Sequence, residues 1–238
     1  MRGVFRRFRP SPDVTVTEAP LQPEQAPPGL VVLGPLEARV LGCLVEKAAT
    51  TPDVYPLTLN AVQLACNQKT NREPIMNAEL GEVGHTLRTL EEKKLVRTER
   101  GARALRYEHT IDAALNLTSR ARAIIALLLL RGPQTQSELL TRSERLADFP
   151  DIESLNDTLD RLIARTPALV VRVGRAPGQR EDRYMHLLCG EVDGAALAAK
   201  YASSGGGAES ADPGLAERVA QLEAAVAELQ AQLAGLRG

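Results

Sequence analysis

One order of secondary-structure signals occurs twice in this chain, and that repetition constrains the fold more than any single motif does. In each copy, three amphipathic helix patterns precede two strand patterns separated by a turn signal. The copies run from Pro35 to Thr110 and from Thr118 to Leu188. Three helices followed by a hairpin is the element order of a winged helix-turn-helix unit. We therefore expect an α+β fold, mainly α with small β-hairpins, built from tandem winged helix-turn-helix domains.

The first copy is outlined by its apolar spacing and its capping residues. Pro35 suits a first helical position, because the N–H that proline lacks would be unpaired there. Thr58 is a good N-cap for the second helix, and Pro74 cannot continue that helix. A β-hairpin is expected around Gly101. The three apolar stripes are Leu36, Val40, Cys43 and Leu44; Leu59, Val62 and Cys66; and, starting near Asn77, Leu80, Val83, Leu87 and Leu90.

The second copy follows the same plan. Thr118 caps a helix that runs through Leu130 and stops at Gly132 and Pro133. Thr135 and Glu138 have the T-x-x-E spacing of a capping box, which predicts the next helix. The third helix and the hairpin are then indicated by Ile152, Leu155, Leu159, Leu162 and Ile163, by the strand patterns Leu169–Arg175 and Arg183–Leu188, and by the turn pair Pro177-Gly178.

Composition divides the chain into five segments. Residues 1–33 hold many prolines and no sustained period, so we expect a disordered arm. Residues 34–112 and 113–192 are the two expected winged-helix domains. Residues 193–214 include a run rich in glycine, serine and alanine, which predicts a flexible linker before residues 215–238.

The last segment carries a heptad pattern and is expected to form a coiled-coil helix. Valine at two a positions with leucine at every d position favours a parallel two-stranded coil, so we expect a homodimer. A helix that folds back onto its own domain is the alternative. The heptad residues are Leu215, Val219, Leu222, Val226, Leu229, Leu233 and Leu236.

Charge gives no whole-protein preference for nucleic acid, because the formal net charge is -1. Both predicted hairpins are nevertheless locally basic, and guanidinium groups on a hairpin can reach phosphates. An ordinary solvated hairpin is the alternative interpretation. The arginines concerned are Arg97, Arg100, Arg103 and Arg106 in the first hairpin, and Arg172, Arg175, Arg180 and Arg183 in the second.

The predicted third helices argue against reading of the major groove. In a helix-turn-helix module this helix enters that groove, but here its solvent face is acidic and would be repelled by DNA. The acidic residues are Glu79, Glu82, Glu91 and Glu92 in one copy, and Glu153, Asp157 and Asp160 in the other.

A dense polar run precedes the first of these third helices. Its amides, hydroxyls and cations are the composition of a contact loop for phosphate or base edges. The same side chains could instead order a long loop by local hydrogen bonds. The run consists of Asn67, Gln68, Lys69, Thr70, Asn71 and Arg72.

Catalytic and metal chemistry have little support in the sequence. The three cysteines form no C-x-x-C, and the histidines lie in different predicted elements. Glu82 and His85 form one E-x-x-H, and metal sites of that type need a second copy. Cys66 could be a thiol activated by Lys69, although an apolar helix position indicates burial. We expect a non-enzymatic, cytoplasmic protein with no metal, no cofactor and no membrane span.

Several runs together resemble the YceH family of bacterial proteins, also known as UPF0502 or DUF480. The resemblance covers roughly residues 36 to 190, implies two winged-helix domains, and supplies no established catalytic or binding residues. The runs are Leu36–Val40, Glu46-Lys47, Thr50–Pro52, Tyr55–Leu57, the specific nonapeptide Cys66–Pro74, Leu128–Gly132, Gln134-Thr135 and Arg183–Leu187.

Two functions follow as expectations. The first is a DNA-binding, regulatory protein that contacts DNA through the hairpin arginines and residues 67–73. The second is a scaffold that uses the winged-helix fold to bind protein partners without DNA. Acidic third helices and a near-neutral charge favour the scaffold, whereas the arginine-rich hairpins favour DNA.

Overall fold

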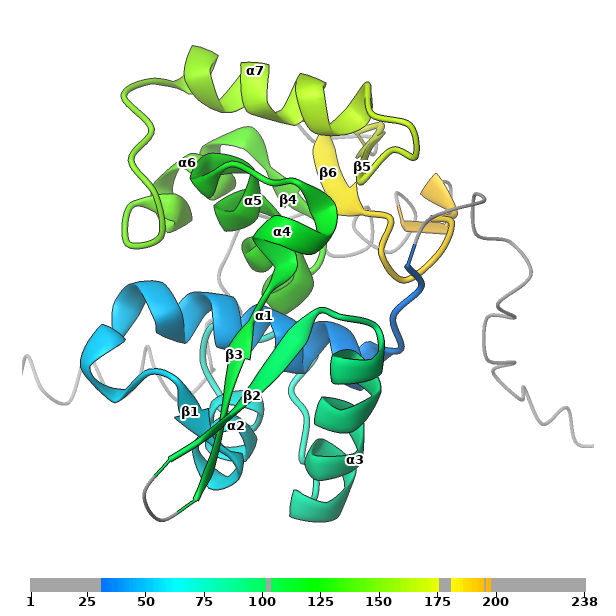
Figure 1. Cartoon of the computed structure of the whole chain (residues 1–238). Coiled ribbons are helices and arrows are strands. Elements are labelled where there is room, and N and C mark those ends of the chain that lie inside the picture. Colours follow the sequence, from blue (N-terminus) through cyan, green and yellow to red (C-terminus); the bar gives the residue numbers. More distant parts are fainter. Residues whose placement is uncertain (1–30, 102–103, 176–180, 195, 198–238) are drawn as a thin grey trace, which may run out of the picture. The chain divides into compact units, whose positions relative to one another are not determined.

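The computed structural model describes residues 31–101, 104–175, 181–194 and 196–197, and its elements are traced in Figure 1. We call the group from α1 to β3 module 1 and the group from α5 to β6 module 2. Module 1 contains α1 (Pro35–Thr50), η2 (Pro52–Val54), β1 (Leu57–Thr58), α2 (Leu59–Cys66), α3 (Leu80–Glu92), β2 (Val96–Arg100) and β3 (Leu105–His109). After α4 (Ile111–Leu115), module 2 contains α5 (Ser119–Arg131), β4 (Gln134–Thr135), α6 (Gln136–Ser143), α7 (Ile152–Ile163), β5 (Val170–Val173) and β6 (Arg183–His186).

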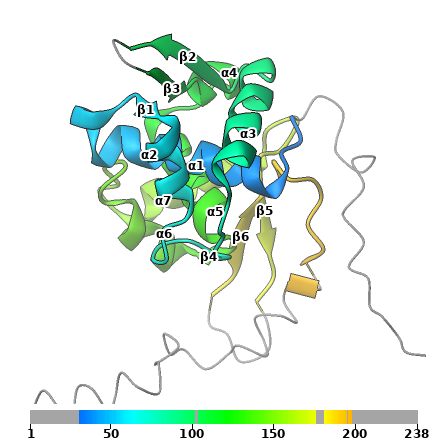
Figure 2. The same cartoon turned by 90° about the horizontal axis from the view of Figure 1, so that it is seen from below.

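Each module has one three-stranded antiparallel sheet with the same topology. The strand orders are β1-β3-β2 and β4-β6-β5, so the last strand lies in the middle of each sheet. In both views the long strands β2 and β3 lie side by side, and so do β5 and β6 (Figure 1 and Figure 2). The protein is therefore a mixed α+β fold with small antiparallel sheets, as the sequence predicts.

The central strands carry the same short motif, Arg-Tyr-x-His. Tyr107 pairs with Leu57 in one sheet, and Tyr184 pairs with Gln134 in the other. The motif begins at Arg106 in β3 and at Arg183 in β6. In each sheet the tyrosine of the motif pairs with the first residue of the short strand, so the two sheets have the same residue register. We call this common arrangement the shared frame.

The modules are joined through their first helices. α1 packs against α5 (Figure 1), and the close approach depends on Gly42. A Cβ atom at Gly42 would lie 2.9 Å from Cγ of Leu130 and 3.2 Å from Cβ of Leu129. Leu41, Ile124 and Leu130 are buried in one continuous hydrophobic core with residues of both modules.

The predicted helix starts are confirmed by their caps. The Oγ1 of Thr58 accepts from the N–H of Ala61 at 3.4 Å, and Thr118 caps α5 in the same way at 3.3 Å. In the predicted capping box, the N–H of Glu138 donates to Thr135 at 3.2 Å and the N–H of Thr135 donates back to the Glu138 carboxylate at 2.9 Å.

Three local predictions are corrected. Leu33 was assigned to the disordered arm, but it is buried and its N–H donates to the Leu188 carbonyl at 2.7 Å. The third helix of module 1 begins at Leu80 rather than near Asn77, and Leu80 is 40% exposed rather than part of the core stripe. The two-residue strands β1 and β4 were not predicted, because their pairing depends on partners distant in sequence.

Several predictions fall outside the described residues. The Pro177-Gly178 turn, residues 1–30 of the arm, most of the linker and the whole heptad segment 215–238 belong to this group. Contacts divide the chain into a larger unit, residues 1–173 with 182–192, and a smaller one, residues 174–181 with 193–238. The smaller unit contains few described residues.

Candidate functional site

The loop between α2 and α3, residues 67–79, which we call the polar loop, is organised around a buried arginine. The side chain of Arg72 has no exposed surface. Its Nη atoms donate to both carboxylate oxygens of Glu46, at 3.1 and 2.5 Å. The remaining donors reach the Ala65 carbonyl at 3.1 Å, the Asn71 carbonyl at 2.9 Å and the Gln68 side chain at 2.8 Å. All five guanidinium N–H groups therefore have partners.

This arrangement corrects one predicted contact residue. Arg72 cannot reach a ligand at the surface, because its charge and every donor are already used inside the protein. Burial lowers the pKa of Arg72, but the hydrogen bonds to Glu46 and the interactions with the Glu46 and Cys43 groups together outweigh burial and raise the pKa overall. Arg72 is a positioning residue for the polar loop.

Two further clamps hold the polar loop. Arg39 of α1 is buried, and its Nη atoms donate to the carbonyls of Cys66 at 3.3 Å and Pro74 at 2.6 Å. The Asn67 side chain accepts from the N–H of Ala78 at 2.8 Å and donates to the carbonyl of the same residue at 2.9 Å. Asn67 therefore serves the structure, as the alternative interpretation of the polar run holds.

The polar loop also contacts module 2. The N–H of Glu73 donates to the carbonyl of Leu130 at 2.8 Å, and the Arg131 side chain donates to Oδ1 of Asn71. In Figure 2 the chain between α2 and α3 runs from module 1 toward β4 and α6. The Cys66–Pro74 segment therefore connects the two modules as a structural bracket. Of the contact residues predicted within the polar loop, Asn67 to Arg72, only Lys69, Thr70 and Asn71 are exposed.

Two hairpin arginines are paired with carboxylates of their own hairpin. Arg97 contacts Glu108, its direct partner in the register, and Glu99 at 3.4 Å. Arg172 donates to Asp182, with 2.7 Å from Nε to Oδ2. Both arginines are largely exposed, so these pairs add little to stability, but they cancel much of the positive charge expected of the hairpins.

Two other hairpin arginines are held by backbone carbonyls. Arg106 donates to the Pro56 carbonyl at 2.7 Å, and Arg183 donates to the Pro133 carbonyl at 3.3 Å and to Glu138 at 3.0 Å. These are equivalent bonds in the shared frame. Both arginines fasten the central strand to the turn before the second helix, and neither points free into solvent.

Of the remaining four hairpin arginines, the structure describes two. Arg100 is exposed at the end of β2, and Arg175 is exposed after β5. Arg103 and Arg180 lie outside the described residues. Among the hairpin arginines that the structure describes, Arg97, Arg106, Arg172 and Arg183 are therefore engaged within the chain.

The third helices present acidic faces in both modules. The acidic side chains predicted at the solvent face, together with the N-cap residue Asp151, are exposed. Each helix also begins with an exposed apolar residue, Leu80 at 40% and Ile152 at 37%. Arg88 and Arg161 are the arginines on these helices. The exposed faces are therefore acidic, with one apolar residue at the first turn of each helix.

The thiols and the E-x-x-H pair lack the geometry of catalytic groups. Cys66 is buried beside Cys43, and the contact with that thiol together with burial raises the pKa of Cys66, so the activated-thiol interpretation is wrong. Glu82 accepts from the N–H of Glu79 as a helix cap. Across the described ranges, no group of three His, Cys, Asp or Glu side chains could hold a metal ion.

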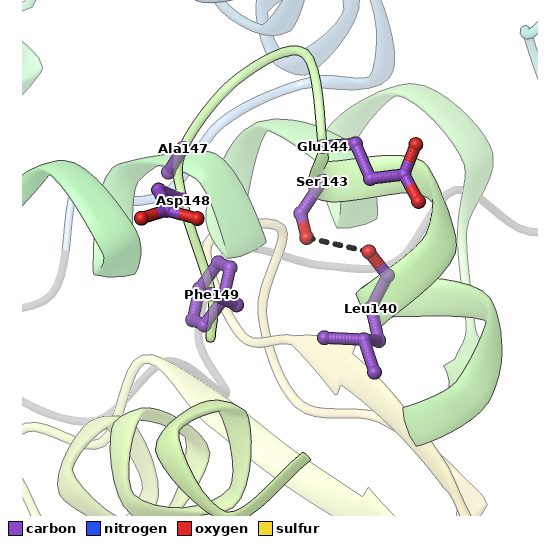
Figure 3. Close-up of a pocket in the computed structure, with 6 residues that line it drawn as sticks. All are labelled: Leu140, Ser143, Glu144, Ala147, Asp148 and Phe149. Atoms are coloured by element: carbon purple, nitrogen blue, oxygen red, sulfur yellow. Dashed lines mark hydrogen bonds between the residues drawn. The ribbon is translucent and has the colours of Figure 1, made fainter. Parts of the chain in front are cut away.

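A surface pocket of about 310 Å³ lies at the end of α6 (Figure 3). Its lining residues are Leu140, Ser143, Glu144, Ala147, Asp148 and Phe149. The Ser143 hydroxyl donates to the Leu140 carbonyl at 2.8 Å. Figure 3 shows Glu144 and Asp148 at opposite ends of the connecting loop, with their carboxylates well separated. The pocket therefore has no converging pair of carboxylates for acid–base chemistry.

A second pocket, of about 340 Å³, lies beside the polar loop. The end of α1, the first residues of the polar loop and Arg145 after α6 line it. The lining residues are Glu46, Lys47, Thr50, Thr51, Gln68, Lys69, Thr70, Asn71 and Arg145.

None of the helices in the described part of the chain has both the length and the apolar character needed to cross a membrane.

Comparisons with known proteins agree with the resemblance in the motifs. The family model described as "Protein of unknown function, DUF480" matches residues 33–179. A UPF0502 protein of Stenotrophomonas maltophilia is 65% identical over 211 residues, which are 89% of this chain and 97% of the relative. UPF0502 proteins of Xanthomonas campestris and Mesorhizobium japonicum are each 54% identical, over 87% and 88% of this chain and 93% and 98% of the relatives. None of these names describes an enzymatic activity. The chain therefore belongs to the DUF480 family, whose relatives bear the name UPF0502.

Proposed function

We propose that each module is a winged-helix unit and that the two form tandem domains, residues 34–112 and 113–192. The support is their common content: three helices, a short strand before the second helix, and a hairpin that pairs with it. Module 1 departs from a helix-turn-helix in one respect. Its second and third helices are joined by residues 67–79, whereas that motif has a turn of about three to four residues.

The function we propose is non-enzymatic: the chain is a scaffold that binds a basic segment of a protein partner through its third helices. One observation carries this proposal. In both modules the exposed face of the helix that would enter DNA is acidic. Carboxylates facing a polyanion are repelled, whereas the same faces attract lysine and arginine side chains.

The exposed apolar residues in the first turns of these helices indicate that the partner segment also has an apolar side. Leu80 and Ile152 add an exposed apolar contact at the start of each acidic face. A basic amphipathic helix matches both features, because its apolar stripe can cover these residues while its cations meet the carboxylates.

DNA binding is the weaker candidate. Four described hairpin arginines are engaged within the chain, namely Arg97, Arg106, Arg172 and Arg183. The carboxylates that pair with Arg97 and Arg172 would remain beside any bound phosphate. Contacts from Arg100 and from Lys69–Asn71 stay part of this second hypothesis.

We further propose that the chain is a cytoplasmic homodimer joined through the heptad residues of segment 215–238. The heptad sequence supports the dimer. Mass measured in solution tests it: the intact chain is expected to have twice its formula mass, and removal of residues 208–238 is expected to give a monomer. A monomeric intact chain contradicts the dimer.

Charge neutralisation on α7 tests the binding function. Glu153, Asp157 and Asp160 are exposed and form no hydrogen bond or ion pair within the described residues, so we expect Glu153→Gln, Asp157→Asn and Asp160→Asn together to leave the fold intact. The probe is a fluorescent amphipathic helix of leucine and lysine, measured by anisotropy. We expect the triple variant to bind it several-fold more weakly than the parent chain does.

Two controls separate a site from general charge attraction. Asp53→Asn, Glu73→Gln and Glu144→Gln change the net charge equally at exposed positions outside the third helices, so this variant is expected to bind like the parent. A scrambled peptide of equal composition is expected to bind poorly. Equal losses in both variants, or retention of mixed-sequence duplex DNA with no preference between the peptides, would contradict the proposal.

A further inference from the structure

The 340 Å³ pocket beside the polar loop has more cationic than anionic groups available to a ligand. Both oxygens of Glu46, the only carboxylate that lines it, accept from buried Arg72. Lys47 lies 3.7 Å from the same carboxylate. Lys69 and Arg145 are exposed, and neither has an ion pair or side-chain hydrogen bond with any residue that the structure describes.

Nearby arginines add to this positive charge. Arg131 donates to the Asn71 side chain at the edge of the pocket. Burial lowers the pKa of Arg131, and so do the positive charges of Arg142 and Arg72, whereas the carboxylates of Glu46 and Glu138 raise it. Arg142 is itself paired with Glu138 at 3.4 Å.

The position at the end of α1 does not explain the cluster by itself. A helix C-terminus attracts cations, and this accounts for Lys47 in the last turn. Lys69 and Arg145 come from two other segments. The hydroxyls of Thr50 and Thr51 donate to the carbonyls of Glu46 and Lys47, at 2.9 and 3.1 Å, so these terminal carbonyls already have partners.

We propose that this pocket binds a phosphate group, with Lys47, Lys69 and Arg145 as the charged donors. Arginine offers a planar fork for two phosphate oxygens, and lysine supplies compact positive charge. The volume falls within the range of small-molecule sites, about 300 to 1,000 Å³, and leaves room for a phosphorylated compound larger than phosphate itself. The hydrogen bonds of Arg72 hold the polar-loop side of the pocket in place before a ligand binds.

This proposal is independent of partner binding by the acidic third helices. The phosphate could belong to a small molecule or to a polynucleotide backbone. Calorimetric titrations at constant ionic strength with inorganic phosphate, adenosine monophosphate and a short mixed-sequence DNA duplex distinguish these sources. Saturable binding of the first two indicates a small phosphorylated ligand, and binding of the duplex alone indicates a backbone.

Variants at the unpaired cations provide the decisive comparison. Lys69→Gln and Arg145→Gln are each expected to weaken phosphate binding about tenfold, because each removes a charge-assisted hydrogen bond to the ligand. Neither residue has an internal partner among those described, so thermal unfolding should be unchanged. Arg88→Gln removes an exposed cation from α3, outside the pocket, and is expected to bind like the parent chain.

Two results would overturn the proposal. One is the absence of saturable binding for all three probes. The other is binding that Lys69→Gln and Arg145→Gln weaken no more than Arg88→Gln does, since that pattern indicates general attraction of anions to the protein surface.

Discussion

Modules 1 and 2 share their sheet register and differ most in the chain between their second and third helices. In the common frame, Thr58 and Thr135 cap the second helix, while Arg106 and Arg183 tie the central strand to the preceding proline carbonyl. In module 2 the connection is residues 144–151, whereas module 1 has the polar loop of residues 67–79. The contacts that both modules share build their sheets. The polar loop, which only module 1 has, connects module 1 to module 2.

The comparison also separates buried from exposed ion pairs. Arg72 has no exposed side-chain surface and its partner Glu46 is 18% exposed, whereas Arg172 is 64% exposed in the hairpin of module 2. The same residue types therefore have different roles. Arg72 organises backbone, and Arg172 screens charge at a surface.

The largest expected effect comes from removing the buried cation. Arg72→Met should lower the free energy of unfolding by about 3 to 5 kcal/mol, because the largely buried Glu46 loses its two hydrogen bonds from Arg72 and keeps only Lys47 at 3.7 Å. Urea unfolding measures the change. Glu46→Gln combined with Arg72→Met should cost less than the single change, because no unpaired carboxylate remains.

The exposed pair supplies the matched control. Arg172→Ala should lower the free energy of unfolding far less than Arg72→Met does, because this ion pair is exposed to solvent. Equal costs for Arg72→Met and Arg172→Ala would show that burial does not distinguish these two pairs.

The next effect concerns the packing of α1 against α5. Gly42→Ala should destabilise the protein by about 1 to 3 kcal/mol, because the new methyl group overlaps Leu130. In contrast, Gly81→Ala in α3 meets nothing within 4 Å and should stabilise the protein by about 0.5 to 1 kcal/mol through helix propensity. Thermal unfolding of both variants checks the contrast, and a neutral Gly42→Ala would contradict the close approach of the two helices.

A smaller, pH-dependent effect compares the two motif histidines. Burial lowers the pKa of His186 from 6.5 to about 4. Between these two pKa values the unfolded chain binds a proton at this histidine and the folded chain does not. The contribution of His186 to the free energy of unfolding is therefore fully present above pH 6.5 and is lost as the pH falls toward about 4. The free energy of unfolding should therefore fall by about 2 kcal/mol from about pH 7 to about pH 5 because of this histidine.

Substitution separates this contribution from other titrations. His186→Gln should remove its share of the pH dependence, as measured by urea unfolding at the two pH values. Burial also lowers the pKa of the equivalent His109, which is more exposed, so His109→Gln should remove less. A larger change for His109 than for His186 would contradict the burial order.

The sequence predicts the elements of this fold well because their signals are local. Caps such as Thr58 and apolar stripes such as Val83, Leu87 and Leu90 depend on neighbours within a few residues. The strands β1 and β4 depend on pairing with β3 and β6, so no local signal revealed them. The repeated Arg-Tyr-x-His was the one available clue to the shared register, and it was missed.

The candidate site was harder to predict for a physical reason. Composition shows that Arg72 and Lys69 are cations, but only the fold shows that Glu46 lies beside Arg72 and that Lys69 has no partner among the described residues. Arg145, across the same pocket, belongs to a segment distant in sequence. Burial and pairing, which decide between structural and binding roles, depend on contacts that spacing along the chain does not encode.

Native-state hydrogen exchange at the N–H of Glu73 tests the central claim, that the Cys66–Pro74 segment is a structural bracket between the modules. This amide donates to the Leu130 carbonyl of module 2 at 2.8 Å. We expect strong protection of the Glu73 amide in the intact chain and its loss in Arg72→Met. Exchange of the Glu73 amide at the rate of an unstructured peptide, in a chain that is otherwise folded, would contradict the bracket.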